Sequence, residues 1–260
     1  MDDPSVVIAA ALPDVAALEA RVTLSASGLV LYGFDARSDD ALVWWRRLAA
    51  VSDETGYQPI VVDPDEYGWL EQNDAFQPPE PVDQLLSQSE DIDGEALLRQ
   101  WGDRSLTEVY GDNLADQIRA QLAGKGDWPD NPVRVALADL TVGWTNTPYA
   151  TSVLLVPAAK PWQVPCLLQT QGWNGYPSAD QHAAILRYFA DAYGARLYDI
   201  SHDGVDLAIS RPPADRAAAI QAAWDYECYN DGAYDIYRHE NVTALAACLI
   251  GADLWRCWWD

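Results

Sequence analysis

A strand, a capped helix and a second strand follow one another near the start of the chain, and this pattern limits the possible folds more than any other feature. Residues 28–35 are predicted to form a strand, and Ser38 is placed to cap the free amides of the helix that follows. Gly56 is typical of the left-handed residue that ends such a helix, and residues 57–62 have the apolar, β-branched character of a second strand. The chain therefore contains a β-α-β unit, in which a helix packs against a sheet.

The same pattern recurs later in the chain. Residues 166–170 are predicted to form a strand, and Ser178 with Gln181 three positions on has the spacing of a capping box. Gly194 is the expected end of this second helix, and residues 195–201 follow as a strand. Because the two units match in layout, we consider a diverged internal duplication. The alternative is that two unrelated units share a common arrangement.

Caps, hydrophobic spacing and turn residues indicate the remaining elements. Residues 63–94 are rich in Pro, Asp, Glu and Gln and are expected to form an irregular surface segment. Asp203 followed by Gly204 predicts a tight hairpin turn. Further helices are predicted over 95–101, 105–122, 213–229 and 243–250, and further strands over 133–142, 151–156 and 254–259.

A linker spaced by prolines indicates where the chain divides. Pro157, Pro161 and Pro165 favour an extended backbone between the two halves. We therefore expect an N-terminal α+β region of unknown relationship over 1–156 and a C-terminal domain over 157–260. The predicted fold class is α+β, with two packed sub-domains, each a small mixed sheet with helices mainly on one face.

The charge balance is strongly acidic. The chain carries 40 acidic and 16 basic side chains, which gives a formal charge of −24 at pH 7. Such a field repels nucleic acid and anionic lipid surfaces and attracts basic proteins. We therefore expect a basic protein partner, no nucleic acid and no membrane. The alternative is that the acidity serves solubility or reflects base composition.

Targeting signals and cofactor motifs are not recognisable in the sequence. The start, Met1 to Pro4, lacks the positive region of a signal peptide, and the four cysteines contain no Cys-x-x-Cys pair. A cytoplasmic protein with reduced thiols is therefore expected. No nucleotide-binding glycine loop and no Gly-x-Ser-x-Gly motif occurs. We accordingly predict no cofactor and no metal.

One group of titratable residues is chemically suggestive. His202, Asp203 and Asp206 lie around the predicted hairpin, and His182 could join them from the start of a helix. An imidazole with two carboxylates could bind a divalent metal or transfer protons. The alternative is structural, because turn chemistry explains Asp203 and alternation along the strand would leave Asp206 on an exposed face.

Several short motifs lie in the last hundred residues. They are Gly172-Trp173-Asn174 followed by Pro177, then His182, Gly194-Ala195, Asp203 with Asp206, Arg211-Pro212-Pro213, and the ending Trp258-Trp259-Asp260. With these motifs, the chain from about residue 162 to 260 resembles an uncharacterised bacterial family known as domain of unknown function 4253. The family pattern often has Cys where this chain has Tyr176, and Glu where it has Asp206. The resemblance implies kinship but no established activity.

A candidate binding surface combines aromatic, amide and guanidinium groups from these motifs. Trp and Arg dominate the energetics of protein interfaces. Tryptophans at the end of the chain could instead close the core. The residues of this candidate surface are Trp173, Asn174, Arg211, Trp258 and Trp259.

The acidic charge, the many aromatic residues and the lack of catalytic motifs favour one function. We expect a noncatalytic acidic binding protein, of an immunity or inhibitor type, for a basic protein partner. The alternative is an enzyme or metal-dependent module centred on His182, His202, Asp203 and Asp206. A structural subunit of a larger assembly is the third possibility.

Overall fold

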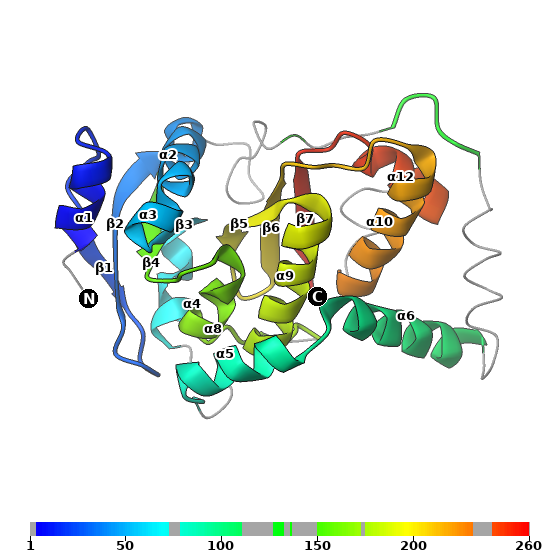
Figure 1. Ribbon diagram of the computed structural model, residues 1–260, viewed down its shortest axis with the longest axis horizontal. Coiled ribbons are helices and arrows are strands. Elements are labelled where there is room, and N and C mark those ends of the chain that lie inside the picture. The colour runs from blue at the N-terminus through cyan, green and yellow to red at the C-terminus, as the bar shows by residue number, and fades with distance from the viewer. Residues whose placement is uncertain are drawn as a thin grey trace.

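A single mixed sheet organises the protein, which is α+β as predicted (Figure 1). The computed structural model describes residues 4–72, 79–110, 127–132, 136, 150–172, 175–230 and 241–259. The described strands lie in the order β1-β2-β4-β3-β5-β6-β7. Their bounds are β1 Glu19–Thr23, β2 Val30–Arg37, β3 Gln58–Val62, β4 Ala150–Val156, β5 Ala195–Ile200, β6 Gly204–Ile209 and β7 Leu254–Trp258.

Helices connect and cover these strands. Their bounds are α1 Pro4–Ala11, α2 Ser38–Ala50, α3 Ser52–Thr55, α4 Tyr67–Glu71, α5 Val82–Asp91, α6 Gly94–Tyr110, α8 Val164–Leu168, α9 Ala179–Tyr193, α10 Arg216–Tyr229 and α12 Val242–Leu249. Two short 3-10 helices, η1 Pro64–Glu66 and η3 Pro161–Gln163, precede α4 and α8. None of the helices in the described parts of the chain combines the length and apolar character that a membrane span needs.

The β-α-β unit predicted from the first quarter of the chain is confirmed. Both β2 and β3 pair antiparallel with β4, so they run parallel to each other with β4 between them. The helical residues that connect them end at Gly56, whose φ of 74° is left-handed. Strand β3 then pairs in parallel with β5, which joins the two halves of the chain into one sheet.

The predicted strand over 166–170 is wrong, because residues 164–168 form helix α8. Pro165 lies in the first turn of this helix, where a missing amide proton removes no intrahelical hydrogen bond. All five residues of α8 are buried, so the run has no polar face from which a helical period could be read. Without that strand the second unit does not repeat the first. Neither the duplication nor two sub-domains with separate sheets is confirmed.

Local signals predicted most other elements of the C-terminal half. The Ser178 amide donates to the Gln181 side chain at 3.2 Å, and Gly194 ends α9 with a φ of 62°. The hairpin of β5 and β6 and helices α10 and α12 are also present. Helix α6 runs without a break through the gap predicted at 102–104, and the segment predicted to be irregular contains η1, α4 and α5. The predicted strand over 133–142 lies outside the described residues, apart from residue 136.

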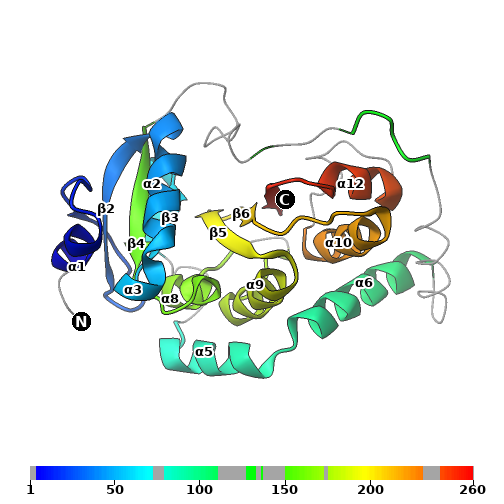
Figure 2. The same ribbon diagram turned by 45° about the horizontal axis from the view of Figure 1, so that its top comes forward.

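Alternating strand residues divide between two cores, one on each face of the sheet. Val61 packs in the core that includes α1 and α2, whereas Ile60 and Val62 pack in the core that includes α8, α9, α10 and α12. Helices therefore cover both faces of the sheet. The prediction that helices would lie mainly on one face is wrong. Figure 2 shows α5 and α6 following one another past α9 and α10, which they contact.

Candidate functional site

Three of the four candidate residues line one acidic pocket. His202, Asp203 and Asp206 surround a cavity of about 300 Å³ at the hairpin end of β5 and β6. The hairpin positions them because its turn lies at residues 201–203, between the paired strands. The pocket is lined by Asp63, Asp65, Glu66, Asp199, Ser201, His202, Asp203, Gly204, Val205, Asp206, Arg256, Cys257 and Trp258.

A row of charged residues crosses three neighbouring strands at this pocket. Asp206 of β6 pairs directly with Asp199 of β5 on one side and with Arg256 of β7 on the other. Directly opposed residues project from the same face of a sheet. Arg256 donates two hydrogen bonds of 2.9 Å to the Asp206 carboxylate, which is buried. The prediction that Asp206 would be exposed is wrong, because β7 covers that edge and brings a partner for the charge.

Among the described residues, no cation forms a comparable ion pair with Asp199. Burial is the main cause that raises the pKa of Asp199 well above its usual range, and the negative charge of Asp206 raises it further. Arg256 opposes this shift only in part. The pocket therefore contains two opposed carboxyl groups in different environments, one paired with a guanidinium and one that favours its protonated form.

His202 lies at the rim between two carboxylates. Its Nδ1 is 2.9 Å from Glu66 Oε2, and its Nε2 is 3.7 Å from Asp203 Oδ2. Asp203 also accepts hydrogen bonds from the Ser201 hydroxyl at 2.9 Å and from the indole N–H of Trp258 at 3.1 Å. These bonds fix the orientation of both acidic side chains and place one edge of Trp258 against the pocket.

His182 does not join the other candidates. It is fully buried on α9, where its ring contacts Tyr176, Tyr229 and Trp259. Its Nδ1 is 2.6 Å from the Tyr229 hydroxyl. Burial lowers the pKa of His182 to about 3, so the imidazole is neutral at physiological pH. Its position is that of a core histidine in an aromatic cluster.

The candidate binding residues do not form one surface. Trp258 lines the acidic pocket, whereas Trp259 is buried beside His182. Arg211 lies beyond the far end of β6, where it donates to the carbonyl oxygens of Ala190 and Asp191 near the end of α9. A basic side chain at this position stabilises the negative end of the helix. Trp173 and Asn174 lie outside the described residues.

Three important pocket residues were missed from the sequence. Asp199 gave a usable signal, since an acidic residue inside a predicted apolar strand needs an explanation. Glu66 and Arg256 could not be assigned to this pocket, because they come from segments that meet β5 and β6 only in the folded protein. No group of three or more His, Cys, Asp and Glu side chains within the described ranges is arranged to hold a metal ion.

Comparison with known proteins identifies one relationship. No curated protein and no solved structure matches the chain. A family model described as "Domain of unknown function (DUF4253)" matches residues 152–260, from β4 through β7. Most of the acidic pocket falls within this match, although Asp63, Asp65 and Glu66 precede it. Residues 152–260 are therefore similar to this family, which is the family that the motifs had indicated.

Proposed function

We propose that the protein is a noncatalytic acidic binding protein, of an immunity or inhibitor type, and that the acidic pocket receives a cationic side chain of a basic protein partner. The observation that carries this proposal is the imbalance of charge in the pocket. Six carboxyl groups line it, at residues 63, 65, 66, 199, 203 and 206, against one guanidinium and one imidazole.

The single guanidinium does not neutralise the pocket. Arg256 is bound to Asp206 through two hydrogen bonds, so its charge balances the carboxylate that is most deeply buried. Asp63, Asp65 and Glu66 come from the segment after β3 and add negative charge to the lining of the pocket. Burial is the main cause that raises the pKa of Asp199, and the negative charges of Asp206 and Glu66 raise it further.

The remaining features suit an arginine or lysine side chain. A concave surface lined with charges of one sign concentrates its electric field and attracts oppositely charged groups. Trp258 lines the pocket beside the carboxylates and offers apolar surface to the alkyl stem of such a side chain. The net charge of −24 would accelerate the approach of a basic protein at low salt.

A matched pair of variants tests the proposal. Glu66→Gln removes one charge from the pocket wall, whereas Glu54→Gln removes one charge from exposed α3, at the other end of β3. Isothermal titration with an octa-arginine peptide at 150 mM salt measures the affinity of each variant and of the wild type for a basic peptide. We expect Glu66→Gln to weaken binding about 5–10-fold and Glu54→Gln less than about twofold. Equal effects of the two variants would contradict the proposal, and a pull-down from the source cells with no basic partner at low salt would also contradict it.

Acid–base catalysis in the same pocket is the second candidate function. The observation in its favour is that Asp199 favours the protonated form beside Asp206, which is paired with a guanidinium. Asp199 could then act as a general acid. Incubation of the protein with a metabolite extract of its own cells, followed by mass spectrometry, tests this candidate. A compound consumed by the wild type but not by Asp199→Asn would support catalysis, and no consumption by either would exclude it for that extract.

A further inference from the structure

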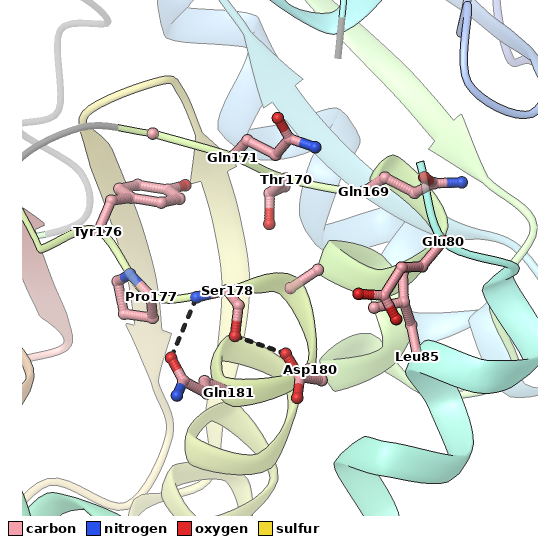
Figure 3. Close-up of a pocket in the computed structure, with 12 residues that line it drawn as sticks. Glu80, Leu85, Gln169, Thr170, Gln171, Tyr176, Pro177, Ser178, Asp180 and Gln181 are labelled. Carbon is pink, nitrogen blue, oxygen red and sulfur yellow. Dashed lines mark hydrogen bonds between the residues drawn. The ribbon is translucent and has the colours of Figure 1, made fainter. Parts of the chain in front are cut away.

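A second pocket lies at the start of α9, outside the acidic pocket. It has a volume of about 360 Å³, within the range of roughly 300–1,000 Å³ that is usual for small-molecule sites. Three segments form its walls: the chain after α8, the first turn of α9, and the start of α5 (Figure 3). It is lined by Glu80, Leu85, Gln169, Thr170, Gln171, Gly172, Tyr176, Pro177, Ser178, Ala179, Asp180 and Gln181.

Two buried polar side chains in this pocket lack hydrogen-bond partners. Thr170 is 1% exposed and Gln169 is 4% exposed, yet the Thr170 hydroxyl and the Gln169 side-chain oxygen bond to nothing among the described residues. Figure 3 shows the Thr170 hydroxyl directed into the cavity. Buried polar groups in folded proteins are nearly always paired, so a group without a protein partner at a cavity is available to a ligand or to water.

The backbone at this point strengthens the same conclusion. Gln169 ends α8 in the left-handed conformation, with a φ of 52°, and it is the one non-glycine residue with positive φ among those described. Glycine occupies such positions without strain. The chain instead places a long amide here, and the oxygen of that amide can only accept a hydrogen bond.

The charges of the pocket define the class of ligand. Glu80 and Asp180 are acidic, and no basic side chain lines the cavity in the described part of the chain. The first turn of a helix attracts anions, but Asp180 already provides a negative group there and accepts a hydrogen bond from the Ser178 hydroxyl at 2.5 Å. The ligand must therefore donate hydrogen bonds and carry positive charge.

We propose that this pocket binds a small molecule that ends in a primary ammonium or a guanidinium group. The cation donates to Thr170 Oγ1 and lies in the field of Glu80, whose side chain faces the cavity in Figure 3. Leu85 and Pro177 provide apolar surface for the alkyl part of the ligand. This site is distinct from the acidic pocket, and the proposal does not depend on the function proposed there.

The pocket is built on residues that carry the family resemblance. Gly172 and Pro177 line it, and a Cβ atom at Gly172 would lie 2.5 Å from the Tyr176 ring and 2.6 Å from the His202 carbonyl oxygen. Only glycine allows the chain to approach so closely. Behind Tyr176 lies the ring of His182, with centroids 4.4 Å apart. These motif residues therefore shape the wall of the cavity rather than the acidic pocket.

Binding of simple amines to the full chain tests the proposal. The probes are n-butylammonium and agmatine, with 1-butanol as the neutral control, measured by isothermal titration and by the rise in Tm. We expect both cations to bind and 1-butanol not to bind. Glu80→Gln and Thr170→Val should each weaken amine binding roughly fivefold or more, whereas Glu54→Gln on α3 should change it less than about twofold.

Several outcomes would overturn the proposal. One is equal binding of 1-butanol and n-butylammonium, and another is full affinity in Thr170→Val. A blocked Gly-Lys-Gly tripeptide distinguishes a free amine from a lysine of a protein. If the tripeptide binds and neither free cation does, a small-molecule ligand is excluded. Loss of amine binding in Thr170→Val and Glu80→Gln reports on this cavity, whereas loss of octa-arginine binding in Glu66→Gln reports on the acidic pocket, so the failure of either proposal is distinguishable from that of the other.

Discussion

Replacing Arg256 by methionine tests how the acidic pocket holds its buried charge. Arg256→Met keeps an apolar stem of similar length but removes both 2.9 Å hydrogen bonds to Asp206. The Asp206 carboxylate, with its side chain 7% exposed, is then left without a cation and next to Asp199. Loss of one partner of a buried ion pair costs about 3–5 kcal/mol. Because the Arg256 side chain is 26% exposed, we expect a smaller loss of about 2–4 kcal/mol at pH 7.

A double-mutant cycle separates this loss from simple repacking. In Arg256→Met with Asp206→Leu both charges are absent, so an apolar pair replaces the ion pair and most of the stability should return. Urea unfolding followed by tryptophan fluorescence measures the free energy of unfolding for all four proteins. The loss of unfolding free energy in Arg256→Met should be smaller at pH 4 than at pH 7, because a buried carboxylate without a partner takes up a proton. A loss below about 1 kcal/mol at pH 7, or a double variant less stable than Arg256→Met, would refute the reasoning.

Three further predictions concern buried polar groups. The folded-state pKa of Asp199 is raised above its ordinary 3.8, so this group lowers stability as pH rises from about 4 through the folded-state value. The Tm of Asp199→Asn minus the Tm of the wild type should therefore increase as the pH rises from 4 to 8. A difference that stays constant over this range would contradict the prediction. Asp225 accepts hydrogen bonds from Tyr193 at 2.5 Å and Gln221 at 2.9 Å, so Asp225→Ala should lose about 2–4 kcal/mol in urea unfolding, and Asp225→Asn less. Without ligand, Thr170→Val should gain about 1 kcal/mol and roughly 2–4 °C in Tm, because it removes an unpaired buried hydroxyl, and a loss of Tm would argue against an unpaired group.

Sequence reasoning found the features of the fold that depend on neighbours in the chain. Gly56 and Gly194 were identified as helix ends because glycine readily adopts the left-handed conformation that ends a helix. The cap at Ser178 was identified because it depends only on Gln181, three residues further along the chain. Helix α8 was missed because a fully buried five-residue run shows no period. The insertion of β4 between β2 and β3 was not predictable, since strand pairing over such distances is decided by packing rather than by local pattern.

In the candidate site too, sequence reasoning found the features that depend on neighbours in the chain and missed those that depend on packing. The hairpin that brings together His202, Asp203 and Asp206 was readable from an Asp-Gly turn. His182 was grouped with them only by residue type, and burial on α9 separates it. The motif residues Gly172 and Pro177 line the second pocket but did not predict it, because an unpaired threonine hydroxyl becomes evident only when its surroundings are known.

The use of arginine inside the fold explains why both pockets remain negative. Arg196 donates to Gln58 at 2.6 Å and to Ser52, Arg187 donates to the Ile92 carbonyl at 2.8 Å, and Arg211 donates to the carbonyl oxygens at the end of α9. Together with Arg256 on Asp206, these four guanidinium groups hold elements of the protein together. With only 16 basic side chains against 40 acidic ones, each such use leaves fewer cations to balance the surface. In both of our proposals, an outside cation neutralises the negative charge that remains in these two cavities.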